Sequence, residues 1–332
     1  MNSSQKSDKQ FIALTIKQQQ VSPMVTHLFT HRDCLFHDTG YEHPEKSDRL
    51  RMVWQYLEED EFEAIVRHDA SMGTTDLLEL AHTPDHIDYI KSKRPDSGIV
   101  QLDPDTFMSP GSYDAAMRGV GAARDAVDLV MTQPGTNAFC AIRPPGHHAE
   151  ADRAMGFCLF NNVAIAAKYA QQKYGITRVA VVDFDVHHGN GTQAIFEDEA
   201  TLFYGSTHQE APFYPGTGHR HETGAGNIFN SPLPEGSGGA EFKIAMERDI
   251  LPALVAFDPE LLIISAGFDA HHQDPRAGLN WTEEDYIWIS NKLMKIAEKS
   301  CSGRVISVLE GGYDLVGLAQ SAAVHVKALL DA

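Results

Sequence analysis

Two clusters of histidine and aspartate stand out in this chain by residue type and spacing. The segment 183–191, Asp-Phe-Asp-Val-His-His-Gly-Asn-Gly, follows the apolar run 179–182, and a second histidine pair, His147 and His148, stands upstream in Arg-Pro-Pro-Gly-His-His. Carboxylates and imidazoles crowded at the end of a buried strand carry a high desolvation cost, which a metal ion or a proton-relay partner removes. The pattern therefore indicates a metal site with acid–base groups beside it.

The candidate metal ligands are Asp185, His187 and Asp269. Because side chains alternate along a strand, the spacing predicts that Asp183, Asp185 and His187 point the same way. Asp269 follows a second apolar run, residues 261–268; an aspartate that only caps a helix or turn is the alternative. Three protein ligands with one open position are typical of catalytic sites, and two oxygens with one nitrogen suit Zn²⁺ without excluding Fe²⁺ or Co²⁺.

Five further polar residues are candidates for proton transfer and charge stabilisation. Hydrolysis at a metal needs a base for the attacking water and an acid for the leaving group, and His147 and His148 are suited to divide these roles. Asp183 is expected to orient one ring and Asn190 the other. Tyr313 follows two glycines that permit a tight turn, and its hydroxyl is a suitable hydrogen-bond donor to an oxyanion.

The elements that must position these residues alternate between strands and helices. Strands are predicted over 137–142, 178–184, 201–205, 260–266 and 304–309, and helices over 112–131, 161–174, 239–257, 282–299 and 315–330. This alternation is typical of a mostly parallel sheet flanked by helices, with ligands bound at the carboxyl ends of its strands. We predict an α/β fold with one domain over 23–332 and a flexible or peripheral segment over 1–22.

Composition excludes several functional classes. The 332 residues carry a formal net charge of −19 at pH 7, which argues against a nucleic-acid-binding surface. No apolar run is long enough for a membrane span, and the N-terminus is polar rather than signal-like. The four cysteines lack CxxC spacing, so neither a disulfide framework nor a cysteine zinc site is indicated. A cytoplasmic protein without nucleic-acid or membrane partners is expected, and a homo-oligomer is left open.

The chain resembles the histone deacetylase superfamily, which has the arginase-deacetylase fold. The resemblance runs from His43-Pro44-Glu45 to the segment 310–313 and rests on RPPGHHA, GFCLFNN, VDFDVHHGNGTQ, PGTG, SAGFDAHHQDP and LEGGYDL. The chain is most similar to the class II-like bacterial members, the histone deacetylase-like amidohydrolases. Two features support this subdivision: Asn190 stands where class I members carry aspartate, and the tyrosine motif reads Glu-Gly-Gly-Tyr.

The resemblance implies roles for individual residues. It implies zinc ligands at Asp185, His187 and Asp269, acid–base work at His148 with His147 assisting, and an oxyanion donor at Tyr313. It implies an acyl-lysine tunnel that includes Gly156, Phe157 and Tyr214, an apolar slot suited to a lysine stem. It also implies two structural K⁺ sites, one formed by Asp183, Asp185, His187, Ser206 and Thr207, the other by Phe196, Glu199, Leu202 and Phe229. Ordinary core packing explains Phe196 and Phe229 equally well.

Two arginines are open to more than one interpretation. Arg276 follows Asp274 and Pro275 at the predicted tunnel rim, where a cation would favour acidic substrates; pairing with Asp274 is the alternative. Arg49 resembles a family arginine near an internal channel, and an ion pair on a helix surface is equally compatible. Four loop histidines are expected to face solvent: His219, His221, His271 and His272.

Three functions are compatible with these residues. The favoured one is zinc-dependent removal of acetyl or other acyl groups from N-acyl-lysine in a peptide or protein. The first alternative, an acetylpolyamine amidohydrolase acting on a small acylated amine, would want carboxylates at the rim where Arg276 stands. A catalytically inactive acyl-lysine-binding module is disfavoured because all the catalytic residue types are retained. A manganese-cluster arginase is disfavoured because Asn190 replaces a carboxylate that a second metal would need.

Overall fold

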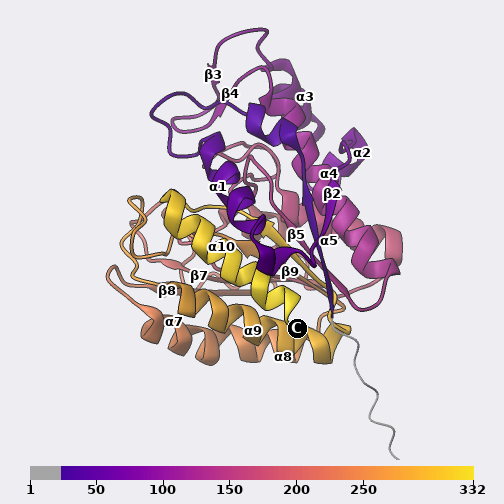
Figure 1. Ribbon diagram of the computed structural model, residues 1–332, viewed down its shortest axis with the longest axis vertical. Helices are drawn as coiled ribbons and strands as arrows, with labels where there is room; N and C mark the ends of the chain where they lie inside the picture. Colours follow the sequence, from indigo (N-terminus) through magenta and orange to yellow (C-terminus); the bar gives the residue numbers. More distant parts are fainter. Residues whose placement is uncertain (1–23) are drawn as a thin grey trace, which may run out of the picture.

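A parallel sheet forms the centre of the protein, seen in a computed structural model that describes residues 24–332; the predicted segment 1–22 lies outside the described residues. Within that range the sheet has eight strands (Figure 1): β1 (Val25–Thr30), β2 (Val66–Asp69), β5 (Thr136–Cys140), β6 (Val179–Asp183), β7 (Leu202–Gln209), β8 (Ile228–Leu233), β9 (Leu261–Ala266) and β10 (Val305–Leu309). Their order is β2-β1-β5-β10-β9-β6-β7-β8, and each neighbouring pair is parallel. A separate antiparallel pair is formed by β3 (Val100–Gln101) and β4 (Phe107–Met108).

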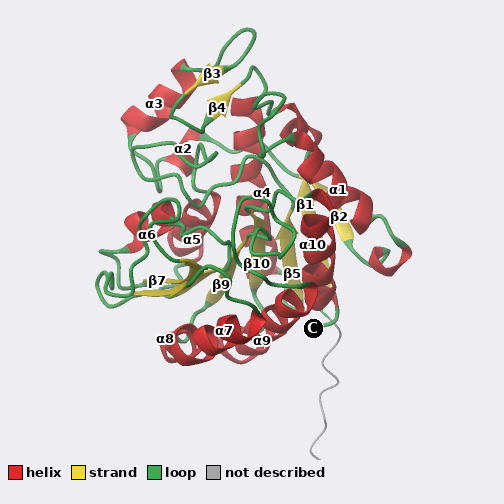
Figure 2. Cartoon of the chain, turned by 90° about the vertical axis from the view of Figure 1, so that its left-hand side faces the viewer, coloured by secondary structure: helices red, strands yellow, loops and turns green. Residues whose placement is uncertain are grey.

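Helices flank the sheet. They are α1 (Ser47–Leu57), α2 (Thr75–Leu78), α3 (Pro84–Ser92), α4 (Ser112–Thr132), α5 (Asn162–Tyr174), α6 (Asn190–Phe196), α7 (Gly239–Ala245), α8 (Leu251–Phe257), α9 (Glu283–Cys301) and α10 (Leu315–Leu330), with short 3₁₀ turns η1 (Arg32–Phe36) and η2 (Asp60–Phe62). Helices α4 and α5 pack together, whereas α10 packs against α1 and α9. In both Figure 1 and Figure 2, α7, α8 and α9 lie together beneath the sheet. The predicted α/β fold is confirmed.

The four central strands are buried along their whole length. Each residue of β5, β6, β9 and β10 is buried. Two of them, β6 and β9, contain continuous apolar runs, at 179–182 and 261–264, rather than alternating patterns. Parallel strands have this composition when both faces of the sheet are covered, because neither face meets water. These strands form the rigid base from which the polar loops project.

One predicted helix needs correction. The helix expected over 239–257 is divided, because α7 and α8 are separated by a π-helical segment, Met246–Ile250. Pro252 stands in the first turn of α8 and has no N–H to donate to the preceding turn. A wider π turn accommodates the missing hydrogen bond. The other four predicted helices and the five predicted strands are present with shifted boundaries, except α10, whose bounds match.

The edge strands and the short helices were not predicted. Strand β2 has four residues and is mostly polar, and β8 contains Pro232, a residue that sheets tolerate at an edge. Strand β7 continues past the predicted end at 205, because its polar residues 206–209 still pair with β8. These segments are held in the sheet by tertiary pairing rather than by an apolar pattern of their own.

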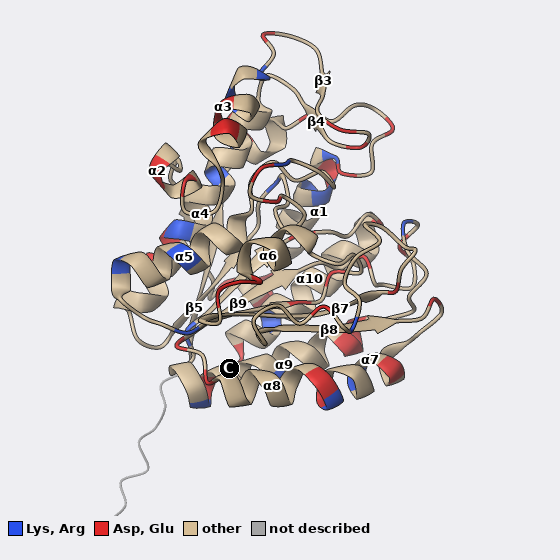
Figure 3. Cartoon of the chain, turned by 180° about the vertical axis from the view of Figure 1, so that it is seen from behind, with Lys and Arg blue, Asp and Glu red and all other residues tan. Residues whose placement is uncertain are grey.

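The surface is acidic but mixed. Asp and Glu number 46 against 27 Lys and Arg in the chain, and Figure 3 shows the two kinds interspersed over loops and outer helices. Among residues 24–332, no helix combines the length and apolar character that crossing a bilayer requires.

Candidate active site

The loops that follow β5, β6, β9 and β10 meet at one edge of the sheet. These strands are neighbours, so their carboxyl ends bring together segments distant in sequence. Backbone N–H groups of one loop donate to buried carboxylates of another: Gly146 donates to Glu310 (2.7 Å), and Gly311 donates to Asp185 (2.8 Å). The same loops carry most of the residues that the sequence predicts for catalysis.

Asp185, His187 and Asp269 form a buried cluster. They offer one ligand atom each, and these atoms lie within 4.8 Å of one another. The Nδ1 atom of His187 is 3.0 Å from Asp185 Oδ1 and 3.1 Å from Asp269 Oδ2. Burial, followed by the negative charge of Asp185, raises the pKa of Asp269 to about 7. Two buried carboxylates facing one imidazole fit a divalent cation, which would neutralise their repulsion.

Asp183 does not join this cluster, which corrects the predicted common direction of the three side chains. Strand β6 ends at Asp183, so the alternation of a strand does not continue to Asp185 and His187. The Oδ2 atom of Asp183 instead lies 3.0 Å from the Nδ1 atom of His147 and accepts a hydrogen bond from the Tyr204 hydroxyl. Asp183 therefore belongs to the histidine pair.

The two histidines of the pair have different partners. Their ring centroids are 4.0 Å apart. His147 Nδ1 faces the carboxylate of Asp183 at 3.0 Å, whereas His148 Nδ1 lies 2.9 Å from the amide oxygen of Asn190. Asn190 Nδ2 in turn donates to Glu150 (2.7 Å). One ring is therefore held by a charged group and the other by a neutral one.

These partners separate the proton affinities of the two rings. Burial alone would lower the pKa of His147, but the carboxylates of Asp183 and Asp185 raise it to about 10. Burial, followed by the positive charge of His147, holds the pKa of His148 well below its usual value. Neighbouring groups whose pKa values are driven apart can divide acid and base roles. His148 is the ring that is neutral and able to accept a proton.

Tyr313 stands beside the Asp-His-Asp cluster. Its ring lies 6.5 Å from the ring of His187, measured between centroids, and the guanidinium of Arg49 lies 4.9 Å from its centroid. Burial, followed by the negative charge of Asp269, holds the pKa of Tyr313 well above its usual value. The hydroxyl therefore stays protonated at neutral pH and can donate a hydrogen bond.

The predicted tunnel residues surround the same site. Gly156 has φ +57°, and a Cβ there would come 2.3 Å from Cδ2 of His148, so this position requires glycine. The ring of Phe157 meets that of Tyr313 edge to face at 5.8 Å. Tyr214 meets the ring of His148 in the same way at 5.2 Å. Aromatic rings thus border both His148 and Tyr313.

Phe213, for which no role was predicted, lies beside the same cluster. The ring of Phe213 stacks on that of His187, with centroids 5.0 Å apart and an interplanar angle of 16°. Its position directly before Tyr214 in the chain was the available signal.

A buried ionic network that the sequence did not predict lies next to the site and contacts the loop of Tyr313. Glu45 accepts hydrogen bonds from Arg49 (2.9 Å) and Arg143 (2.7 Å), and the three side chains are buried. Arg49 also donates to the backbone carbonyl of Glu310 (2.6 Å), which leads into the Tyr313 loop. An ion pair on a helix surface is therefore wrong for Arg49. The four-residue spacing of Glu45 and Arg49 was a signal for pairing but not for burial.

Two carboxylates for which the sequence predicted no role, Asp103 and Asp105, lie in the loop beside Gly156. Asp105 Oδ1 accepts a hydrogen bond from the backbone N–H of Gly156 (3.2 Å). Burial, followed by a hydrogen bond to Asp103, raises the pKa of Asp105 to about 6. The charges of both aspartates also act on Tyr214. The surroundings of Gly156 and Tyr214 are therefore acidic.

Arg276 is exposed, and its backbone N–H, not its guanidinium, contacts Asp274, donating to Oδ1 at 2.9 Å. Within residues 24–332 no ion pair joins the two side chains, so the proposed pairing with Asp274 is wrong as a side-chain interaction. A role for Arg276 in substrate choice stays a prediction.

One of the four histidines expected to face solvent does not. His219, His221 and His272 are exposed, but His271 is 2% exposed, and its Nε2 atom lies 3.4 Å from Oε1 of Glu283. The loop after β9 folds back so that His271 pairs with Trp281 in an isolated bridge. This long-range pairing buries a loop position that local sequence predicts to be exposed.

The residues of the first expected K⁺ site lie close together. Pairing of β6 with β7 sets Asp183 opposite Ser206, and Thr207 follows. The Thr207 hydroxyl is buried and lacks a hydrogen-bond partner within the described chain, which suits an oxygen ligand for a cation.

Three residues of the second expected K⁺ site share one hydrogen-bond partner, and the site itself stays a prediction. The carbonyls of Phe196, Glu199 and Leu202 converge on the side-chain amide of Asn227, which donates to all three at 2.7–3.2 Å. Phe229, the fourth expected residue, stacks its ring on Phe203. Asn227 was not among the predicted residues.

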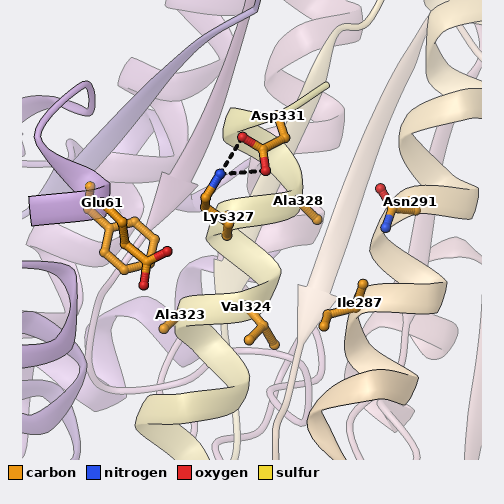
Figure 4. Close-up of a pocket in the computed structure, with 9 residues that line it drawn as sticks. Glu61, Ile287, Asn291, Ala323, Val324, Lys327, Ala328 and Asp331 are labelled. Carbon is orange, nitrogen blue, oxygen red and sulfur yellow. Dashed lines mark hydrogen bonds and ion pairs between the residues drawn. The ribbon is translucent and has the colours of Figure 1, made fainter. Parts of the chain in front are cut away.

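A hollow of about 280 Å³ lies elsewhere on the surface, between η2, α9 and α10 (Figure 4). It is lined by Glu61, Phe62, Ile287, Asn291, Ala323, Val324, Lys327, Ala328 and Asp331. The lining includes none of the predicted catalytic, metal or tunnel residues, so this hollow is separate from the site.

Comparisons with known proteins show which family the chain resembles. Residues 43–329 match the model of the histone deacetylase domain. A probable deacetylase of Archaeoglobus fulgidus is 38% identical over 302 residues, which are 89% of this chain and 83% of that protein. The histone deacetylase-like amidohydrolase of Pseudomonas aeruginosa is 39% identical over 242 residues, 72% of this chain and 63% of that protein.

A solved structure agrees in fold as well as sequence. The crystal structure of the HDA15 HD domain matches with a TM-score of 0.87 and 35% identity, covering 92% of this chain and 90% of that one. Relatives named deacetylases and amidohydrolases identify the chain as an enzyme that hydrolyses amide bonds. The chain belongs to the histone deacetylase family.

Proposed function

We propose that this enzyme removes acetyl or other acyl groups from N-acyl-lysine side chains of peptides or proteins, with Zn²⁺ held by Asp185, His187 and Asp269. The proposal is carried by one observation: the buried Asp-His-Asp cluster lies beside two differently held histidines and a protonated tyrosine. A divalent metal at such a cluster supplies Lewis-acid polarisation of a carbonyl and activation of a water.

The side chains supply the remaining chemistry. His148, kept neutral by burial and bonded to a neutral amide, accepts the proton of the attacking water. His147, held charged by Asp183, contributes a positive charge beside the reacting amide and assists proton delivery to the leaving amine. Tyr313 donates its hydroxyl hydrogen to the oxyanion that develops on the acyl carbonyl.

The substrate class follows from the walls of the tunnel. The rings of Phe157 and Tyr214 border the histidine pair and Tyr313. An apolar passage between aromatic rings suits the methylene stem of a lysine, at about 25 cal/mol per Å² of apolar surface removed from water. The amide at the end of that stem would then reach the catalytic groups.

A second substrate class is favoured by the rim. Asp103 and Asp105 place carboxylates next to Gly156 and Tyr214, and such groups would bind the distal amine of an acylated polyamine. An acetylpolyamine amidohydrolase is therefore the alternative function. Structural K⁺, a cytoplasmic location, the absence of nucleic-acid partners and the oligomeric state stay predictions.

The metal part of the proposal is tested by removal and replacement. The enzyme is stripped with a chelator and titrated with Zn²⁺, Fe²⁺ or Co²⁺ while hydrolysis of an acetyl-lysine peptide is followed. We expect activity to return in proportion to metal bound, up to one ion per chain at this cluster. Full activity in the stripped protein would contradict the proposal.

A further inference from the structure

A buried carboxylate outside the predicted site holds the backbone of Tyr313. Asp274 is 6% exposed and lies in the loop after β9, five residues beyond Asp269. Its Oδ2 atom accepts hydrogen bonds from the backbone N–H groups of Tyr313 (2.6 Å) and Asp314 (3.0 Å). Its Oδ1 atom accepts one from Arg276 (2.9 Å). One side chain thus satisfies three backbone donors in two loops.

The loop that carries Tyr313 is held by hydrogen bonds between its backbone and buried side chains. Gly312 has φ +120°, so the chain turns sharply just before the tyrosine. Helix α10 begins only at Leu315, and the N–H groups at 313 and 314 stand before its first turn. On the inner side the loop is tied by Arg49, which donates to the Glu310 carbonyl. At the other end of the loop, Asp274 accepts the hydrogen bonds of the N–H groups of Tyr313 and Asp314.

We propose that Asp274 is a positioning residue for catalysis: its carboxylate holds the Tyr313 backbone so that the hydroxyl is directed at the Asp185–His187–Asp269 cluster. The inference rests on the oxyanion role given to Tyr313 under the proposed function. Asp274 touches neither the cluster nor the substrate passage through its own carboxylate. Because Asp274 and Asp269 share one loop, the clamp also keeps the tyrosine in register with a metal ligand.

The chemistry of the clamp requires a carboxylate. Hydrogen bonds to an ionised acceptor are shorter and stronger than neutral ones, and both oxygens of Asp274 accept. An asparagine has one acceptor oxygen, which can serve Tyr313 and Asp314 while its NH₂ group turns toward Arg276. An alanine leaves all three N–H groups without this partner. We therefore expect a graded series, with Asp274→Asn less impaired than Asp274→Ala.

A matched control is available in Asp285. This carboxylate is also buried, accepts a hydrogen bond from the backbone N–H of Thr282 (3.0 Å) and caps α9. It contacts Lys243 rather than the tyrosine loop. Asp285→Asn should lower the melting temperature while leaving kcat unchanged, which separates loss of a buried carboxylate from loss of the clamp.

The experiment is a double-mutant cycle on the zinc-loaded enzyme with an acetyl-lysine peptide. Asp274→Ala should lower kcat about 10²-fold, the size of effect that a misplaced catalytic group produces, with KM and zinc content unchanged. In a Tyr313→Phe background the same substitution should change kcat by about twofold or less, because the hydroxyl it positions is gone.

The possible results separate the two proposals. Equal losses from Asp274→Ala in both backgrounds, or an equal loss from Asp285→Asn, would overturn the positioning role while leaving the oxyanion role intact. If Asp274→Ala does not fold, the same cycle is measured with Asp274→Asn. This variant should lower kcat in the wild-type background and leave it unchanged in the Tyr313→Phe background. Full activity of Tyr313→Phe by itself would refute the oxyanion role, and the positioning role with it.

Discussion

The Nδ1 atom of His148 lies 2.9 Å from the amide oxygen of Asn190, whereas His147, whose ring centroid is 4.0 Å away, faces the carboxylate of Asp183. A neutral partner leaves the proton affinity of His148 to be set by burial and by its charged neighbour. Because Asn190 carries no charge, it does not offset these two effects, and His148 stays neutral as the proposed mechanism requires.

Asn190→Asp should shift the pH dependence of catalysis. A new negative charge beside His148 raises its pKa, so the ring stays protonated up to a higher pH. The neutral form that acts as base is then present only above that pH. We expect the acid limb of the kcat/KM profile to move upward by about one pH unit. Asn280→Asp, a change at an exposed loop asparagine, should leave the profile unchanged. An unshifted limb in Asn190→Asp would exclude His148 as the base.

Tyr313→Phe should separate metal binding from turnover. The ring and its contacts with Phe157 and Arg49 remain, so folding and zinc content should be unchanged. Loss of one oxyanion donor should lower kcat by about 10² or more. Steady-state kinetics with metal analysis of the same sample decides the point, and wild-type turnover in the variant would remove Tyr313 from the mechanism.

Asp269→Ala should abolish both metal binding and hydrolysis. The variant leaves one carboxylate and one imidazole, which is too few ligands for a stable site. The matched control is Asp258→Ala, at an exposed aspartate after α8, which should bind one equivalent of zinc. Zinc retained at full stoichiometry in Asp269→Ala would show that the cluster is not the metal site.

Much of this site is foreseeable from sequence, because its residues follow continuous apolar runs. The runs at 179–182 and 261–264 identify buried strands, and the residues after them lie at the sheet edge as predicted. The separation of Asp183 from Asp185 was not foreseeable, since it depends on where β6 ends. The roles of Glu45 and Asp274 were not predicted, because the spacing of Glu45 and Arg49 indicates pairing but not burial, and Asp274 acts through contacts with a loop distant in sequence.

The free energy of unfolding should decrease as the pH falls, in part because His325 is buried in its neutral form. Burial lowers the pKa of this ring to about 3, and its two nitrogens face the hydroxyls of Ser290 (2.6 Å) and Ser307 (2.8 Å). In the unfolded chain the His325 ring takes up a proton near pH 6.5, whereas in the native state it stays neutral down to about pH 3. The stability contribution is therefore complete above pH 6.5 and declines as the pH falls toward 3, by about 1.4 kcal/mol per pH unit.

This stability prediction is checked by urea unfolding between pH 4 and 5.5, where the unfolded-state ring is almost fully protonated and the native ring is neutral. In His325→Gln, which keeps a polar side chain without this titration, the slope of unfolding free energy against pH should be smaller by about 1.4 kcal/mol per unit. An identical slope in wild type and variant would show that His325 takes up a proton in the native state as readily as in the unfolded chain.

The central claim, hydrolysis of an acyl-lysine amide, is tested most directly by comparing kcat/KM for an acetyl-lysine peptide and for N-acetylputrescine. The enzyme is used with zinc restored, and Tyr313→Phe serves as the blank. We predict a clear preference for the peptide, because the aromatic passage suits a lysine stem and leaves the peptide backbone outside. A preference for N-acetylputrescine would contradict the account and assign the rim carboxylates Asp103 and Asp105 to binding the distal amine.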